Sequence, residues 1–224
     1  MELATGKVSW TRQPTAGDIY NTGCDPGVHG SCPEAHGHDF DFGQPPILVT
    51  LKSGKRALVA GQKSGIVYGF DPDAEGKLLW DRRIGEGGTL GGVQWGSAAN
   101  DGRVYSALSD LRLRGVPDKK EKMGYRLEGD GAKGGGLFAI NAATGEIVWS
   151  AKPVPCGERS PCSPAQSAAV SGIPGVVFSG SLDGHLRAYA TGSGDVIWDA
   201  DTEREYVTVN GENLTGALWM WQVR

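Results

Sequence analysis

Short apolar segments separated by glycine-rich turns run along most of this 224-residue chain. Clear examples are residues 57–61, 64–70 and 103–108. Segments of this length are typical of β-strands, and no window keeps apolar residues at helical spacing over three turns. The pattern therefore predicts an all-β protein.

One eleven-residue pattern returns along the chain and indicates internal repeats. Its clearest copy runs from Ala139 to Trp149 (AINAATGEIVW), where a strand ends, the chain turns at Thr-Gly, and a new strand ends at Trp. Further copies run from Ala188 to Trp198 and, with one extra residue, from Gly69 to Trp80. Leu3 to Trp10 has only the second half of the pattern.

Each complete copy follows a strand, a turn and a second strand, so that the repeating unit has four short strands. The first strands of the second and third units are expected at 93–99 and 166–170. Units of this kind are typical of β-propeller blades. We expect a blade remnant at 1–10, an insertion at 11–44, blades at 45–82, 91–151 (with an insertion at 109–134) and 163–200, and an irregular tail at 201–224. Both insertions are expected to be loops over one end of the propeller, where function usually lies.

Propellers typically close with four to eight blades. About three complete blades and a remnant are too few, so the chain either pairs with another copy or is a fragment of a longer protein. We favour the fragment, because the chain begins inside a repeat.

Composition excludes several classes of protein. With 39% hydrophobic and 21% charged residues, the chain has enough apolar surface to fold. A net charge of −4 argues against nucleic acid as the main partner. There is no apolar run of the length that a membrane-spanning helix needs.

Four cysteines fall into two local pairs, Cys24 with Cys32 and Cys156 with Cys162, each in a Pro/Gly-rich stretch. We predict two short-range disulfides and therefore an exported origin. The first residues do not have a signal-peptide pattern, so the export signal is expected in a full-length parent. A zinc site that uses the first pair with His29, His36 and His38 is the weaker alternative, because its spacing matches no common zinc motif.

The repeat A-x-[DN]-x-x-T-G-x-x-x-W at Ala139 to Trp149 resembles the tryptophan-docking motif of quinoprotein alcohol dehydrogenases. Three longer segments are similar to the polyvinyl alcohol dehydrogenase-like branch: residues 39–71, 91–105 and 162–198. The resemblance implies an eight-bladed propeller that binds pyrroloquinoline quinone (PQQ) with Ca²⁺.

The resemblance also implies roles for five residues. Asp41, with Asp39 as second choice, matches the catalytic base, and Asp41 is also the candidate Ca²⁺ ligand. Lys63 matches the cation that hydrogen-bonds the quinone carbonyls, and Gln94 and Trp95 match an Asn-Trp pair that faces the cofactor. The family's Ca²⁺-binding Glu and the Trp on which PQQ stacks are expected upstream of this chain.

The function so implied is oxidation of an alcohol, either polyvinyl alcohol or another secondary alcohol, with PQQ as hydride acceptor. Electrons would pass to cytochrome c or a quinone in the periplasm, and this chain alone is expected to be incomplete. The alternative is a non-catalytic propeller of the same repeat class that serves as a protein-binding scaffold. Such a scaffold has no reason to keep Asp41 and Lys63, so we favour the enzyme.

Overall fold

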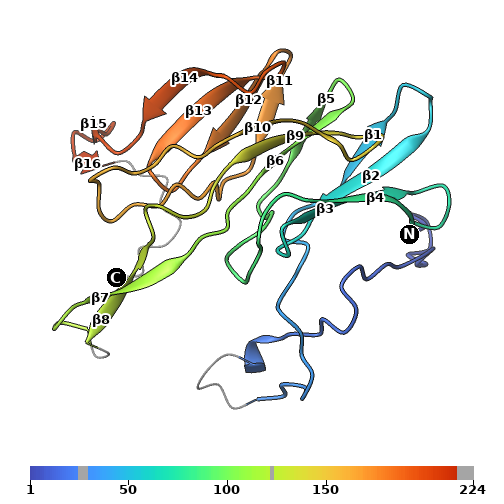
Figure 1. Ribbon diagram of the computed structural model, residues 1–224, viewed down its shortest axis with the longest axis horizontal. Helices are drawn as coiled ribbons and strands as arrows, with labels where there is room; N and C mark the ends of the chain where they lie inside the picture. The colour runs from blue at the N-terminus through green and yellow to red at the C-terminus, as the bar shows by residue number, and fades with distance from the viewer. Residues whose placement is uncertain (25–29, 122–123, 216–224) are drawn as a thin grey trace.

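The computed structural model describes residues 1–24, 30–121 and 124–215. In it three four-stranded antiparallel sheets lie next to one another in chain order (Figure 1). The helical structure in these ranges is one 3-10 turn, η1 (Thr22–Cys24). The expected all-β class and its four-stranded units are confirmed. No helix in the described ranges is long and apolar enough to cross a membrane.

Each sheet is a blade in which neighbouring strands pair in an antiparallel ladder. Blade 1 consists of β1 (Ile47–Thr50), β2 (Arg56–Gly61), β3 (Ile66–Asp71) and β4 (Lys77–Arg83). Blade 2 consists of β5 (Ala98–Asn100), β6 (Arg103–Ala107), β9 (Leu137–Asn141) and β10 (Ile147–Ala151). Blade 3 consists of β11 (Ser171–Ile173), β12 (Val176–Gly180), β13 (His185–Ala190) and β14 (Val196–Asp201).

The first strands of blades 2 and 3 begin later than the apolar pattern suggests. We expected strands at 93–99 and 166–170, but these stretches mostly run as loop, in which Val93, Gln166 and Val170 are buried. Val93 donates its backbone N–H to the carbonyl of Gln62, and Gln166 donates to the carbonyl of Leu108. Val93 and Gln166 are buried because their loops pack against the preceding blade. The sequence pattern alone cannot distinguish burial of this kind from burial of a strand within a sheet.

Two segments expected to be irregular contain hairpins. In the insertion at 109–134, β7 (Leu113–Pro117) pairs with β8 (Tyr125–Gly129), and in the tail β15 (Glu205–Val207) pairs with β16 (Asn213–Thr215). Hairpin β7–β8 replaces the short turn that connects the two middle strands in blades 1 and 3. It projects from the same side of the sheets as the N-terminal insertion (Figure 1).

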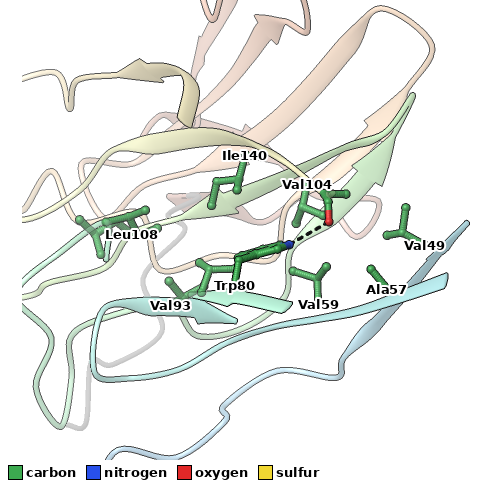
Figure 2. Packing of buried hydrophobic residues seen from close by; sticks show 11 residues of the cluster. Val49, Ala57, Val59, Trp80, Val93, Val104, Leu108 and Ile140 are labelled. Atoms are coloured by element: carbon green, nitrogen blue, oxygen red, sulfur yellow. Dashed lines mark hydrogen bonds between the residues drawn. The ribbon is translucent and has the colours of Figure 1, made fainter. Parts of the chain in front are cut away.

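A tryptophan at the end of one blade packs on a glycine turn of the next. The indole of Trp80 donates a hydrogen bond to the carbonyl of Ala142 (3.0 Å), as Figure 2 shows within the core between blades 1 and 2. A Cβ atom on Gly145 would lie 2.6 Å from the Trp80 ring, so only glycine fits below it. Trp149 makes the same contact with Gly194 of blade 3.

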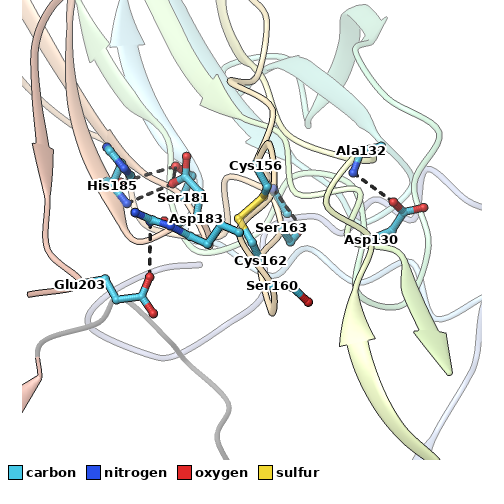
Figure 3. The surroundings of a disulfide bond; sticks show 12 residues. Asp130, Ala132, Cys156, Ser160, Cys162, Ser163, Ser181, Asp183, His185 and Glu203 are labelled. Carbon is cyan, nitrogen blue, oxygen red and sulfur yellow. Dashed lines mark hydrogen bonds and ion pairs between the residues drawn. A yellow bond between two sulfur atoms is a disulfide. The ribbon is translucent and has the colours of Figure 1, made fainter. Parts of the chain in front are cut away.

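Both predicted cysteine pairs are disulfides in the structure. Cys24 and Cys32 are bonded to each other and so cannot supply the thiolates of the zinc alternative, whose His29 lies outside the described residues. The loop closed by Cys156 and Cys162 lies between hairpin β7–β8 and blade 3 (Figure 3). Its Arg159 donates to the carbonyl of Asp183 (2.6 Å) and thereby attaches the loop to blade 3.

Candidate functional site

Lys63 lies in the turn between β2 and β3, against the loop that leads into β1. Its backbone N–H donates to the carbonyl of Asp41 (2.9 Å), which fixes the turn against the loop. Its ammonium group donates to Asp41 Oδ2 at 2.9 Å and to Asp39 Oδ2 at 3.2 Å. Three of the residues singled out in the sequence therefore meet in one cluster, which we call the Lys63 cluster (Asp39, Asp41 and Lys63).

The two carboxylates differ in their exposure to solvent. The side chain of Asp39 is 13% exposed and that of Lys63 is 17% exposed, whereas that of Asp41 is 67% exposed. Asp41 is thus the carboxylate that an approaching ligand can reach directly, while Asp39 lies behind the ammonium group.

Burial and charge separate the protonation behaviour of the cluster. The hydrogen bond from Lys63 holds the pKa of Asp41 below its usual value. Burial raises the pKa of Asp39 against the opposing hydrogen bond and charge of Lys63. Burial alone would lower the pKa of Lys63, but its hydrogen bonds to Asp41 and Asp39 outweigh this effect and the pKa lies above its usual value.

The turn that carries Lys63 is also held by its neighbour Gln62. The buried side-chain carbonyl of Gln62 accepts hydrogen bonds from Ser64 Oγ (2.7 Å) and from Thr15 Oγ1 (3.1 Å). Because Thr15 belongs to the N-terminal insertion, this contact joins the insertion to the turn.

A glycine-rich loop packs on the other side of Lys63. Gly88 donates its N–H to the carbonyl of Lys63 (3.0 Å), and a Cβ atom on Gly92 would lie 2.2 Å from that oxygen. The buried carboxylate of Asp110 accepts hydrogen bonds from the N–H groups of Glu86, Gly87 and Gly92 at 2.7–3.0 Å. This acid therefore holds the loop closed against the Lys63 backbone.

Gln94 and Trp95 take no part in the hydrogen bonds described for the Lys63 cluster. The Gln94 amide donates to the carbonyl of Gly91 (2.7 Å), and its Cα and Cβ would be 3.7 Å from a Cβ on Gly43. Trp95 has φ +46° and is 41% exposed. It borders a hollow of about 290 Å³ whose other walls are residues 167–169 and 180–182.

The other two blades provide an internal comparison. The backbone hydrogen bond from Lys63 to Asp41 has equivalents from Ser109 to Gly92 in blade 2 and from Leu182 to Ala165 in blade 3, all at 2.9 Å. The blade fold therefore forms this junction without a charged pair. The acid and the lysine occur at this junction in blade 1 and not at the equivalent junctions of blades 2 and 3.

Two acidic residues that the sequence analysis did not single out organise the surroundings. Asp18 accepts hydrogen bonds from the backbone of residues 38–40, and Asp110 accepts from residues 86, 87 and 92. Their partners lie 18 to 24 residues away in the sequence. No sequence motif marks such contacts, because the donors are backbone groups of arbitrary residues.

The chain forms consecutive four-stranded blades, and the tryptophan of one blade packs on a glycine turn of the next. These features define it as part of a β-propeller built from PQQ-like repeats. A family model described as "Outer membrane protein assembly factor BamB" matches residues 63–217. The chain belongs to this PQQ-like repeat family. Lys63 is the first matched residue, and Asp39 and Asp41 precede the match.

The chain is also related to two polyvinyl alcohol dehydrogenases. The protein from a Pseudomonas species is 42% identical over 224 residues, which is 97% of this chain and 32% of the relative. The protein from Sphingopyxis sp. strain 113P3 is 39% identical over 223 residues, 97% of this chain and 31% of the relative. The chain thus spans about a third of the length of the curated relatives it matches.

Solved structures agree on the fold. The quinohemoprotein alcohol dehydrogenase from Comamonas testosteroni matches with a TM-score of 0.55 and 19% identity, over 75% of this chain and 32% of that one. The enzyme ADHIIG from Pseudomonas putida HK5 matches with a TM-score of 0.52 and 18% identity, over 82% of this chain and 35% of that one. At this identity the likeness establishes the propeller architecture alone.

Proposed function

We propose that this chain supplies part of the active site of a PQQ-dependent alcohol dehydrogenase. The observation that carries the proposal is the Lys63 cluster, in which one ammonium group holds two carboxylates at 2.9 and 3.2 Å. The equivalent backbone junctions of blades 2 and 3 join Ser109 to Gly92 and Leu182 to Ala165, so neither has a charged pair at this place. The relationship to polyvinyl alcohol dehydrogenases supports the same conclusion.

The donors of the cluster fit a quinone cofactor. An ammonium group has three N–H donors, and the two carboxylates take two of them, so a third can serve a quinone oxygen. Gln94 supplies an amide in the neighbouring loop. When bound, PQQ would supply an electrophilic carbonyl that accepts hydride from the carbinol carbon.

Asp41 is placed to accept the hydroxyl proton of an alcohol. It is the exposed carboxylate of the cluster and can meet a hydroxyl group directly. The hydrogen bond from Lys63 lowers its pKa, so it is ionised at neutral pH but is also a weaker base than a free aspartate. Lys63 remains protonated beside it, and its positive charge would stabilise negative charge that develops on an oxygen at the site. Asp39 would keep the ammonium group in place from the enclosed side.

Asp41 is also the proposed protein ligand of Ca²⁺. Ca²⁺ takes six to eight oxygen ligands, and an exposed carboxylate is a suitable one. The ion would act as a Lewis acid towards a carbonyl oxygen. We propose polyvinyl alcohol or another secondary alcohol as substrate, cytochrome c or a quinone as electron acceptor, and the periplasm as location. The two disulfides agree with export.

The test is mutation of the cluster in the complete parent protein. Lys63→Ala and Asp41→Asn should each lower PQQ-dependent dye reduction by about 100-fold or more, the size expected for a lost catalytic group. The control is Lys55→Ala, which removes an exposed lysine from the β1–β2 turn and should leave the rate unchanged. Near wild-type rates for both cluster variants, with unaltered thermal unfolding, would overturn the assignment.

A protein-binding scaffold is the second candidate, and the description of the matching family model favours it. A scaffold would bind no PQQ, and its partner would bind equally well to Lys63→Ala. Titration of the purified parent protein with PQQ, followed by absorbance, separates the two candidates. Saturable binding that Lys63→Ala weakens supports the enzyme.

A further inference from the structure

We infer that Asp18 is a positioning residue for the Lys63 cluster. Its carboxylate binds the backbone immediately beside Asp39 and Asp41 and thereby sets where these two side chains meet the ammonium group. The inference rests on the proposed function for its effect on turnover, but its structural part can be tested separately.

Three consecutive backbone N–H groups converge on the Asp18 carboxylate. Oδ1 accepts from His38 and Asp39, both at 3.2 Å, and Oδ2 accepts from Phe40 at 2.6 Å. Successive N–H groups that point to one side of the chain form a concave site for an anion. Here the anion is a side chain of the same protein, 20 to 22 residues earlier in the sequence.

The backbone conformation that this contact holds is an unfavourable one. Asp39 has φ +63°, in the left-handed region that residues other than Gly seldom adopt. Such a conformation persists only where the surroundings enforce it. The Asp18 carboxylate binds the N–H of Asp39 itself and those on both sides, so it is well placed to enforce this conformation.

Asp18 is itself fixed in place. Its carbonyl accepts a hydrogen bond from the Gln13 side chain (2.8 Å), and the next residue, Ile19, donates to the carbonyl of His36 (3.0 Å). Gly37 passes so close that a Cβ atom there would lie 2.6 Å from the Cα of Asp18. The carboxylate is therefore a fixed anchor for residues 38–40 and not a freely moving surface group.

Loss of the Asp18 hydrogen bonds should change the positions of Asp39 and Asp41 more than the affinity of the site for a ligand. Asp18 lies outside the Lys63 cluster, and its carboxylate accepts hydrogen bonds from the backbone of the loop that carries Asp39 and Asp41. When the anchor is weakened, the carboxylates should occupy a wider range of positions around Lys63. Small misplacements of reacting groups reduce turnover strongly, whereas binding through the remaining contacts persists.

The experiment compares Asp18→Asn with Asp71→Asn in the complete parent protein. Both changes remove one negative charge and replace an acceptor oxygen by an N–H₂ group. Asp71 accepts a backbone hydrogen bond from Asp73 at the far end of blade 1 and is a matched control. Asp18→Asn should lower kcat about tenfold and change KM less than about threefold, and Asp71→Asn should leave both nearly unchanged.

Amide hydrogen exchange gives a readout that does not depend on turnover. In Asp18→Asn the amides of residues 38–40 should exchange at least about tenfold faster, while those of β2, β3 and β6 keep their rates. Unchanged exchange at 38–40 would overturn the inference. So would an unchanged kcat, or faster exchange throughout the blades, which would indicate a general loss of stability.

The outcomes also distinguish this inference from the proposed function. If Asp41→Asn abolishes turnover but Asp18→Asn does not reduce it, the enzyme assignment stands and the positioning role fails. If Asp41→Asn and Lys63→Ala both retain full turnover, the proposed function fails. In that case exchange at residues 38–40 still reports whether Asp18 anchors the loop.

Discussion

The two carboxylates that share Lys63 differ because one is exposed and the other is enclosed. Asp41 is exposed and takes the shorter hydrogen bond, so the pKa of its carboxyl group is lowered. Asp39 is enclosed, and burial raises its pKa despite the same ammonium group. Two carboxylates bound to the same ammonium group therefore have pKa values shifted in opposite directions. Such shifted pKa values are often found where acid–base chemistry takes place.

Replacing Lys63 by Gln should raise the pKa of Asp41 towards the ordinary aspartate value. In the native chain the lowered pKa means that stability gained from ionised Asp41 is present at neutral pH and is lost as the pH falls through the folded-state pKa. NMR titration of the Asp41 carboxyl carbon measures the shift directly. Asp73, whose pKa is lowered by Arg56, is the internal control and should not move.

An unchanged Asp41 midpoint in Lys63→Gln would contradict the geometry of the cluster, since the hydrogen bond from the ammonium group is the main cause of the lowered pKa.

At the scale of the elements, two blades pack together through a tryptophan of one blade and a glycine of the next, where a larger residue would clash with the indole ring. Gly145 adopts φ +73° and also lies directly below the Trp80 ring. The repeat motif therefore encodes two things at once: a tight turn within a blade and a flat surface for the neighbouring blade. This explains why Gly and Trp return four residues apart in all three blades, as Gly76 with Trp80, Gly145 with Trp149 and Gly194 with Trp198.

Gly145→Ala should destabilise the chain by about 2 to 5 kcal/mol, because it adds a left-handed non-glycine residue and a clash with the indole. Gly175→Ala is the matched control. Gly175 has φ +84° in open space, so the change should cost only about 1 to 2 kcal/mol. Urea unfolding of both variants gives the comparison, and equal costs would show that the contact with Trp80 contributes little.

At the scale of the whole molecule, the tryptophans do not all have a neighbouring blade to pack against. Trp80 is 8% exposed between blades 1 and 2, whereas Trp198 at the end of blade 3 is 49% exposed. Val196 and Ile197 beside it are exposed too, but so are the equivalent residues 78–79 of blade 1 and 147–148 of blade 2. The open ring of Trp198 is therefore what distinguishes the end of blade 3 in the described chain.

Trp80→Ala should therefore destabilise the 224-residue chain by about 3 to 5 kcal/mol, and Trp198→Ala by less than about 1 kcal/mol. Thermal or urea unfolding of the two variants measures the difference. A cost at Trp198 as large as that at Trp80 would mean that another surface covers β14 in solution, for example through self-association, which sedimentation would detect.

Much of the fold was readable from the sequence because its signals are local. Strand and turn periodicity, the Trp-Gly repeat and cysteine pairs six and eight residues apart all act over short distances. The boundaries of β5 and β11 were wrong because burial between blades produces the same apolar pattern as burial within a sheet. Hairpin β7–β8 was missed because its strands are mostly exposed.

Asp39, Asp41 and Lys63 could be singled out through a resemblance to a family, but their catalytic and binding roles stay predictions. The sequence by itself determined the class of fold, the repeat and the residue types available for chemistry. Only the tertiary structure decided that one ammonium group joins both carboxylates, that just one of these is exposed, and that Asp18 and Asp110 hold the loops around them. The reason is physical: these features depend on backbone groups about twenty residues away and on burial, neither of which leaves a pattern in the order of the amino acids.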